Sequence, residues 1–361
     1  MAETETPISL EEIDSAINVA IHYLSQHQLP NGEFIAYMAP DEAMQDPSCS
    51  YESMTYTTAL IGHCLLPFQN RPEVDTILKK LTAFLQYQAM RGGVWNFFSK
   101  YHRLFKFLPP DTDDTAIISA LFKKRNIDFP DNVPLLLCNR ASNGIFYTWF
   151  TLHKNFRKYP KAFWRLIARE LKYPIKILLF WMKEDLKRDD IGPVVNANII
   201  AYLGYSEITK PATQYIVDTL KKNKEENSDN WYKNILIYYY FIARLAVLNI
   251  PEIIEIRELL INKIINKIHS SRTFFNCSLE LAVGITSLLM LSYEGPLIEK
   301  CMRQLLLQQT KDGEWERYGF YTTPSQARFW GCEELTTALG IEALHLYRQY
   351  LNKKLSGGSD I

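Results

Sequence analysis

Hydrophobic positions along the chain recur at the spacing of amphipathic α-helices, and signals for β-strands are poor. Two segments show the pattern most clearly. Their apolar positions are Val74, Ile77, Leu78, Leu81, Phe84 and Leu85 in the first, and Leu297, Ile298, Met302, Leu305 and Leu306 in the second. Charged residues occupy the opposite side of each segment, which predicts outer helices with one face in solvent.

Other segments are apolar nearly all round and rich in small residues, as is typical of buried helices. The clearest are 57–61, 114–118 and 336–340, and the weaker ones are 195–199, 235–241 and 281–285. Six buried helices that alternate with amphipathic ones predict an all-α fold, an (α/α)6 barrel of alternating inner and outer helices. A helical solenoid is the alternative.

The domain organisation follows from the absence of linkers in the sequence. No Gly/Ser-rich or Pro-rich stretch divides the 361 residues, so we expect a single helical domain over residues 1–355. The stretch around 128–150 has no clear helical pattern and is expected to be an irregular insertion. The end, 356–361, is expected to be a disordered tail.

Composition narrows the function classes. Lys plus Arg equals Asp plus Glu at 40 each, which argues against nucleic acid as a partner. Residues 1–7 lack the features of a secretory signal, and the six cysteines form no CxxC pair, so we expect reduced thiols in a cytoplasmic protein. The apolar stretch 235–248 contains Arg244 and is shorter than the ~20 residues of a membrane span.

In a barrel of this kind the inner helices run parallel, so their N-termini collect at one mouth. The residues expected there are Tyr56, Asp111 to Asp114, Asn196, Trp231, Cys277 and Glu333. Helix N-termini carry partial positive charge, which stabilises a carboxylate after it has given up a proton. The mouth therefore suits an acid.

Three carboxylates in four positions, Asp111, Asp113 and Asp114, come just before the apolar stretch 117–122. Carboxylates crowded so closely cannot all ionise at neutral pH at ordinary cost, so we expect at least one of them to hold a proton. The plainer interpretation is helix capping, with Asp111 as N-cap and the other two in the first turn.

The residues 111–116, DTDDTA, resemble the DxDD motif of class II terpene cyclases, the squalene-hopene cyclase and prenyltransferase–squalene oxidase repeat family. The segment 309–315 resembles the QW repeat of that family, and 28–34 and 88–95 resemble degraded copies. Typical members have two helical barrels, whereas this chain is long enough for one. The resemblance therefore implies a single-barrel member whose cavity is small, open, or closed by a second copy or another protein.

The resemblance implies a protonation-initiated cyclisation of an isoprenoid, a polyprenyl diphosphate or a related polyene. Asp113 would be the general acid, and Asp111 and Asp114 would orient and polarise it. Protonation requires no cofactor, and Mg²⁺ is left open for a diphosphate substrate. The alternative is a non-catalytic barrel that binds an isoprenoid or a protein partner.

Aromatic faces stabilise carbocations, and the chain contains 7 Trp, 21 Tyr and 19 Phe. Core packing is the alternative use of each ring. The residues expected to contact substrate are Trp95, Trp149, Trp231, Trp330, Asn143, Asn196, Cys277 and Glu333. Asn139 and Asn198 join the two asparagines as amides that would hold a ligand or the acid, or cap helices.

Patterns for metal sites are incomplete. A DDxxD box beginning at Asp113 would need an acid at position 117, where Ile117 stands, and Asp189-Asp190 is followed by Pro193. Cys332 and His345 lack the DxC pattern of a zinc prenyltransferase. No metal site is therefore predicted.

The stretch 154–188 has eleven Lys or Arg and three acids, interleaved with aromatic residues. Such a segment could rest on the surface of an anionic membrane or attract a diphosphate. A solvated outer face explains it equally well.

Overall fold

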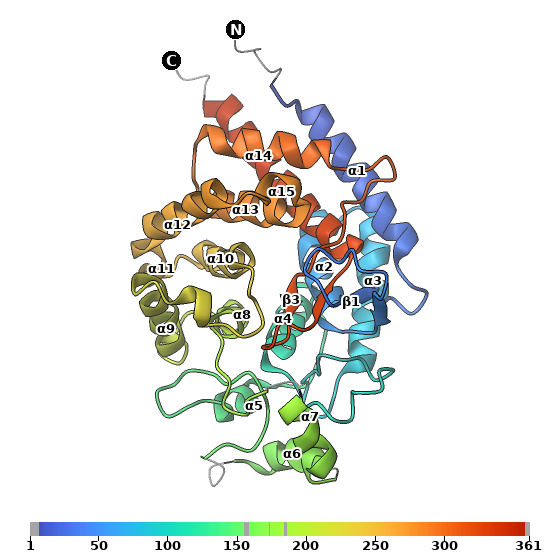
Figure 1. Ribbon diagram of the computed structural model, residues 1–361, viewed down its shortest axis with the longest axis vertical. Helices are drawn as coiled ribbons and strands as arrows, with labels where there is room; N and C mark the ends of the chain where they lie inside the picture. The colour runs from blue at the N-terminus through green and yellow to red at the C-terminus, as the bar shows by residue number, and fades with distance from the viewer. Residues whose placement is uncertain (1–6, 155–158, 173, 184–185, 358–361) are drawn as a thin grey trace.

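A computed structural model describes residues 7–154, 159–172, 174–183 and 186–357 of the protein, and most of these residues are helical (Figure 1). All six segments predicted as buried helices are helical. They lie in α2 (Tyr56–Leu65), α4 (Thr112–Lys124), α8 (Pro193–Leu203), α10 (Ile235–Ala243), α13 (Ser278–Met290) and α15 (Glu333–Gly357).

These six helices form a closed ring. Each contacts the next in chain order, and α15 contacts α2, so the last helix meets the first. Every residue of α2 and of α10 is buried, which agrees with sequences that are apolar on all sides. We refer to these six as the ring helices.

Amphipathic helices cover the outside of the ring. They are α1 (Leu10–His27), α3 (Pro72–Gln88), α9 (Lys210–Lys221), α12 (Arg257–Ser270) and α14 (Pro296–Leu307). Each packs on one or two ring helices. The predicted faces hold, since all six apolar positions of α3 are buried and α14 buries Ile298, Met302 and Leu305. Leu307 ends α14 and is exposed.

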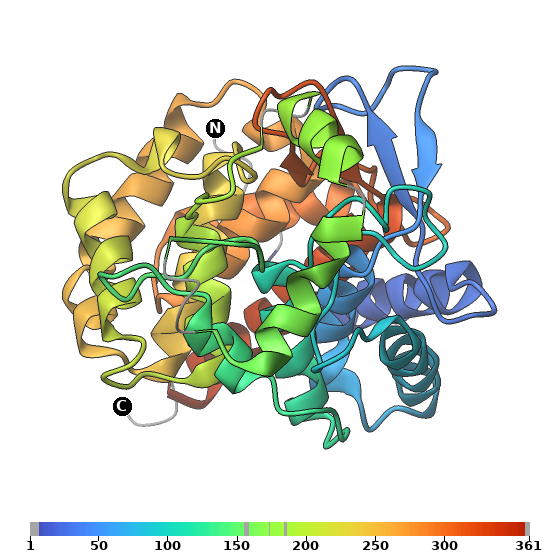
Figure 2. The ribbon, with the colours of Figure 1, turned by 90° about the horizontal axis from the view of Figure 1, so that it is seen from below.

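Further helices and turns connect the ring helices. They are α5 (Val133–Cys138), α6 (Lys161–Lys172), α7 (Pro174–Lys183) and α11 (Pro251–Glu255), with 3-10 turns at Leu66–Phe68, Glu225–Asn227, Arg244–Leu248 and Phe274–Asn276. The stretch 128–150 contains α5. Figure 2, which looks from below, shows α6 and α7 in front of the ring helices. Of the predicted tail, Ser356 and Gly357 end α15, and 358–361 lie outside the described residues.

A four-stranded antiparallel sheet departs from the all-helical prediction. Its strands are β1 (Ala36–Ala39), β2 (Ser50–Glu52), β3 (Tyr321–Thr322) and β4 (Phe329–Gly331), in the order β2-β1-β4-β3. Tyr37 pairs with Tyr51 on one side and Gly331 on the other. Tyr321 of β3 hydrogen bonds Thr57 of α2 over 2.9 Å, which ties the sheet to the start of a ring helix.

The segments that resemble QW repeats make matching contacts where outer helices end. In 309–315 and 28–34, the glutamine amide donates to the glycine carbonyl four residues on and to a neighbouring outer helix, at Ala16 and Ile77 respectively. Gly32 has φ +91°, and a Cβ there would lie 2.0 Å from a backbone carbonyl oxygen of α3, so only glycine fits.

The tryptophans of two such segments also have equivalent positions. Trp315 and Trp95 each donate Nε1–H to the carbonyl ten residues earlier, over 2.7 and 2.8 Å. Both indoles are fully buried. These segments therefore fasten outer helices to the ring.

Candidate active site

The acidic cluster Asp111, Asp113 and Asp114 lies at the start of α4, and all three carboxyl groups are buried. Asp111 is the N-cap, and its Oδ1 accepts backbone N–H groups from Asp113 at 2.6 Å and Asp114 at 3.3 Å. Its own N–H donates to the carbonyl of Trp95. The capping interpretation is therefore correct for Asp111, and this cap fixes where the other two carboxyls point.

Asp113 receives one hydrogen bond on each carboxyl oxygen, from two other parts of the ring. The Nδ2 of Asn198, in α8, donates to Oδ1 over 2.7 Å. The hydroxyl of Tyr232, just before α10, donates to Oδ2 over 2.6 Å. Burial raises the pKa of Asp113 to about 6, and the bonds from Tyr232 and Asn198 oppose a larger rise because they stabilise the carboxylate.

Asp114 points to a different partner, the hydroxyl of Thr55 before α2, which donates to its Oδ1 over 2.7 Å. Burial raises the pKa of Asp114 to about 8. Burial also raises the pKa of Asp111, and the charges of Asp114 and Asp113 raise it further. The expectation that at least one of the three holds a proton at neutral pH agrees with these shifts.

A cation near the opposite end of the ring acts on Asp113. The guanidinium of Arg244, at the end of α10, lies 5.7 Å from the ring centroids of both Tyr240 and Phe241. Its positive charge lowers the pKa of Asp113, because it favours the ionised form.

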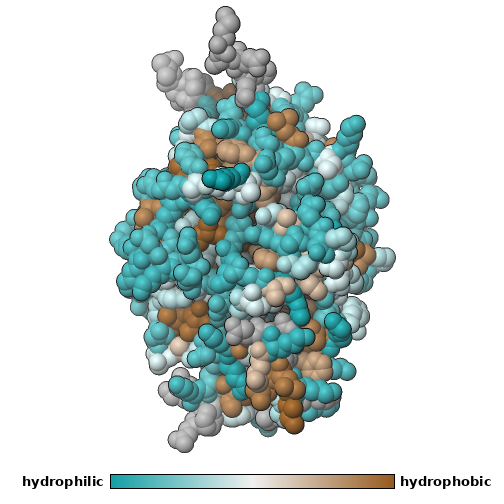
Figure 3. Space-filling model, in the orientation of Figure 1, coloured by the Kyte–Doolittle hydropathy of each residue, from teal (hydrophilic) through white to brown (hydrophobic). Residues whose placement is uncertain are grey.

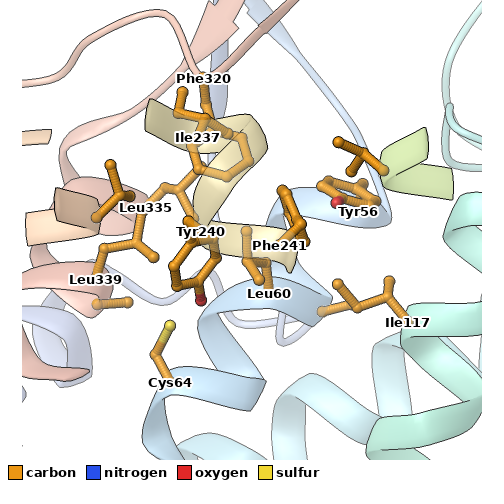
Figure 4. Packing of buried hydrophobic residues seen from close by; sticks show 14 of the residues in the cluster. Tyr56, Leu60, Cys64, Ile117, Ile237, Tyr240, Phe241, Phe320, Leu335 and Leu339 are labelled. Carbon is orange, nitrogen blue, oxygen red and sulfur yellow. The ribbon is translucent and has the colours of Figure 1, made fainter. Parts of the chain in front are cut away.

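Apolar and aromatic side chains surround the acid. Figure 4 shows side chains of α2, α4, α10 and α15 pointing toward one another inside the ring, with Phe320 above them. The ring of Tyr232 packs against Phe241 at 5.2 Å and against Tyr56 at 6.4 Å between centroids. Tyr56 in turn meets Tyr321 edge-on at 5.7 Å. Tyr232, one of the two partners of Asp113, thus belongs to a continuous aromatic cluster.

That cluster continues to a cavity beside the acids. Tyr321 stacks on Trp330 at 5.9 Å, and Trp330 belongs to the cavity wall. The cavity encloses about 50 Å³ and is lined by Phe97, Phe98, Leu104, Leu108, Asp111, Trp149, Leu186, Trp231, Thr323, Arg328 and Trp330. It is smaller than the ~300–1,000 Å³ of pockets that hold drug-sized ligands. Asp111 reaches its wall, and Asp113 lies beyond it among the tyrosines.

Three of the four predicted tryptophans meet at this cavity. Trp149 and Trp231 are in edge-to-face contact at 5.4 Å, and Trp231 donates Nε1–H to Asp190 over 3.0 Å. The Nε1 atoms of Trp149 and Trp330 are buried and have no hydrogen-bond partner within the described part of the chain.

The other predicted contacts lie elsewhere. Trp95 belongs to a helix-fastening segment and packs against Phe122, and both ends of the Asn196 amide are used by the backbone of Phe146. Asn143 is exposed and accepts a turn N–H from Ile145. None of Trp95, Asn143 and Asn196 belongs to the described wall of the cavity, and the structure does not bring their side chains together with Asp113.

The remaining two predicted residues mark helix starts. Cys277 is the buried N-cap of α13, and Glu333 begins α15 and pairs with Arg317 at 3.5 Å. Neither belongs to the cavity wall. The described residues contain no group of three or more His, Cys, Asp or Glu side chains arranged to hold a metal ion.

Sequence reasoning missed Tyr232 and Thr55, the hydroxyl donors to Asp113 and Asp114. Tyr232 directly follows Trp231, which the sequence analysis placed at the mouth of the barrel. That adjacency was the signal from which Tyr232 could have been predicted to lie near the acids. Asn198 was one of four asparagines for which holding the acid and capping stood as alternatives, and the structure places it on the acid.

Comparison with known proteins shows similarity in fold. No model of a protein family matches the sequence, and neither does any curated protein. A protein from Actinoplanes matches with TM-score 0.67 and 14% identity, covering 92% of this chain and 99% of that chain. A variant of type II terpene cyclase MstE from Scytonema, in complex with its substrate geranylgeranyl dihydroxybenzoate, matches with TM-score 0.66 and 16% identity, covering 94% and 98%.

A third match is a possible member of the GH105 family from Salmonella enterica, with TM-score 0.54 and 11% identity, covering 97% of each chain. At such identities the similarity shows a shared fold. The chain therefore shares a fold with MstE and with the possible GH105 member, and enzymes are among its structural neighbours.

Proposed function

We propose that the protein is a type II terpenoid cyclase, which starts ring closure of an isoprenoid by protonating it, with Asp113 as general acid. One observation carries the proposal. Asp113 is buried at the N-terminus of a ring helix, each of its oxygens accepts a hydrogen bond, and its pKa is about 6. The fold shared with MstE, which binds geranylgeranyl dihydroxybenzoate, supports the isoprenoid class.

The architecture belongs to the same proposal. The ring helices would be the inner layer of an (α/α)6 barrel, with α1, α3, α9, α12 and α14 in the outer layer. Thr55, Asp113 and Tyr232 lie at or just before the starts of α2, α4 and α10, and Asn198 lies in the middle of α8, so four of the ring helices position the residues around the acids.

The proposed step transfers the proton of the Asp113 carboxyl to one carbon of an alkene. The π electrons form the new C–H bond, and the other carbon becomes a tertiary cation. A neighbouring alkene of the same chain then attacks that cation to form a C–C bond and close a ring. The final cation loses a proton, so the cyclisation is an isomerisation overall.

Each group around Asp113 helps the acid lose its proton. Tyr232 and Asn198 donate to the carboxylate that remains, and charge-assisted hydrogen bonds of this kind are stronger than neutral ones. The N-terminus of α4 and the charge of Arg244 act in the same direction. The faces of Tyr56, Phe241 and Phe320 would stabilise the cation through their ring quadrupoles.

Substrate entry requires the walls to move. The cavity of about 50 Å³ is too small for a polyprenyl chain, and its aromatic cluster with Tyr321 separates it from Asp113. Tyr321 and Trp330 lie on β3 and β4, whose strands are two and three residues long. We infer that outward movement of this hairpin joins the cavity to the acid.

The test is incubation with C15, C20 and C30 isoprenoids, followed by mass spectrometry of the products. Asp113→Asn should lower the rate at least ~100-fold, the usual contribution of a general acid. The matched control is Asp131→Asn, the same change at an exposed carboxylate, which should leave the rate unchanged. A cyclising wild type whose Asp113→Asn variant is equally fast would refute the acid assignment.

The size of the cavity favours a second candidate, a barrel that binds an isoprenoid or a protein partner without catalysis. It predicts no product from any substrate, and an affinity for the isoprenoid that Asp113→Asn leaves intact. We also propose that Mg²⁺ accompanies the substrate if that substrate is a diphosphate. Repeating the reactions with EDTA tests this, because removal of the metal leaves Asp113 unchanged and any loss of product is then due to the metal.

A further inference from the structure

Helix α7 carries an exposed apolar stripe. Ile175, Leu178, Leu179 and Met182 lie three or four residues apart, on one face of the helix, and are 72, 55, 59 and 71% exposed. The opposite face of α7 is already used, because Ile177 and Trp181 are buried there. Exposed apolar residues normally occur singly on soluble proteins, so a four-residue stripe indicates an interaction surface. Figure 3 shows hydrophobic atoms gathered at this end of the molecule.

Cations surround the stripe. Lys176 and Lys183 belong to α7, whose sequence contains no acid. Beside it, a hollow of about 720 Å³ is lined by Arg91, Lys100, Lys106, Arg165 and Lys172, together with apolar residues and without any carboxylate among its described lining residues. Lys172 lines the hollow and lies just before α7, so the hollow and the stripe are neighbours along the chain.

We propose that α6 and α7 form a docking face that rests on an anionic lipid bilayer. An apolar stripe bordered by lysine and arginine is the pattern of helices that lie in the bilayer interface, where apolar side chains enter the acyl boundary and cations meet lipid headgroups. A protein partner would need both an apolar surface for the stripe and an acidic surface for the five cations of the hollow. An anionic bilayer offers acyl chains and charged headgroups together. No helix among the described residues is long and apolar enough to cross the membrane.

The docking face connects to the candidate site. Trp181 of α7 packs on Trp149 of the cavity wall at 5.9 Å, and Leu186, just after α7, also lines the cavity. An isoprenoid dissolved in the bilayer would therefore meet the cavity next to the docked helix. This last step rests on the proposed function, and the docking itself does not.

Co-sedimentation with vesicles tests the docking. The full chain should bind phosphatidylcholine vesicles that contain phosphatidylglycerol, bind less to phosphatidylcholine alone, and bind less at high salt. Leu178→Glu with Met182→Glu should abolish binding. Lys176→Gln and Lys183→Gln should each weaken it about fivefold, as expected for one basic residue near an anionic surface.

The matched control is Leu307→Glu, which changes a leucine that is 74% exposed on α14, and it should leave binding unchanged. Circular dichroism shows whether each variant folds. Wild type that stays in the supernatant overturns the docking. If vesicles never bind and Leu178→Glu/Met182→Glu changes the oligomeric state in gel filtration, the stripe is a contact between copies of the chain and the docking is likewise overturned. The docking would also be overturned if inorganic phosphate released the protein from vesicles and the Leu178→Glu/Met182→Glu variant bound vesicles as well as wild type does.

The cyclase proposal can fail without the docking. Asp113→Asn is predicted to bind vesicles as wild type does, because the acid is buried away from the docking face. A protein that binds vesicles and yields no product keeps the docking and loses the cyclase. A protein that cyclises a dispersed substrate but does not bind vesicles keeps the cyclase proposal and loses the docking.

Discussion

The two ends of the ring interior hold opposite charges. At the start of α4 lie three buried carboxyls with raised pKa values, and at the end of α10 lies the guanidinium of Arg244. Figure 4 shows Tyr240 and Cys64 together at the second end, apart from Tyr56 at the first. Both placements follow the helix dipoles, which favour negative charge at N-termini and positive charge at C-termini.

The difference lies in how each end meets the cost of burial. A carboxyl can take up a proton and become neutral, whereas a guanidinium stays charged at any pH that proteins tolerate. The carboxyls at the start of α4 can therefore bind and release protons, whereas Arg244 keeps a fixed positive charge. Tyr240 donates to Glu342 over 2.7 Å, which places an acceptor beside Arg244. The comparison predicts that a substitution of Arg244 will change the pKa of Asp113.

Arg244→Met should have the largest effect. It removes a charge that lies over the faces of Tyr240 and Phe241 and that the charge of Glu342 favours, so the free energy of unfolding should fall. It should also raise the pKa of Asp113. Urea denaturation measures the first effect, and Arg244→Lys, which keeps a charge, should lose less. Equal stability of the two variants would remove Arg244 from its role as fixed charge.

Asp114→Asn tests proton binding by the carboxyls through stability. The pKa of Asp114 rises from 3.8 to about 8 on folding, so the folded state binds the extra proton. Its contribution to stability is complete below pH ~4 and is lost as pH rises through ~8, at up to ~1.4 kcal/mol per pH unit. Thermal denaturation of the wild type should therefore move to lower temperature between about pH 5 and pH 8.

In the variant, asparagine still accepts the Thr55 hydroxyl and has no proton to lose, so its curve should be flatter and its stability at pH ~8 higher than that of wild type. Asp131→Asn, at an exposed carboxylate, is the control and should follow wild type. Identical pH dependence in all three proteins would show that Asp114 ionises normally.

The helices could be predicted because their signal is local. A segment such as 235–241 is apolar on every side and long enough to be recognised, and it forms a fully buried helix. The sheet could not, since strands of two to four residues are too short to show an alternating pattern, and β1 finds β4 almost three hundred residues away.

The site divides in the same way. The acids could be found because they adjoin in sequence, and Trp231 because it precedes a buried helix. The donor Tyr232 depends on a turn held by Asp229, which accepts the backbone N–H groups of both Trp231 and Tyr232, and that turn is visible only in three dimensions. Trp95 was assigned to substrate because composition cannot separate a wall tryptophan from one that fastens a helix.

Tyr232→Phe should have the smallest and most specific effect, a change in pH dependence. Asp113 must be protonated to act, so the rate of the wild type should fall about tenfold per pH unit above pH ~6. The hydroxyl of Tyr232 stabilises the carboxylate, and a hydrogen bond to a charged group is worth about 1.5–3 kcal/mol, or one to two pKa units. Its removal should move the fall in rate to higher pH by at least about one unit.

The plateau at low pH should drop at the same time, because an acid of higher pKa gives up its proton less readily. Tyr321→Phe is the matched control. Its hydroxyl bonds Thr57 instead of Asp113, and its ring belongs to the same aromatic cluster, so it should leave the midpoint of the pH profile in place. Profiles of the rate against pH for the three proteins decide the matter, since equal shifts in both variants would trace the effect to the packing of the cluster and not to the acid.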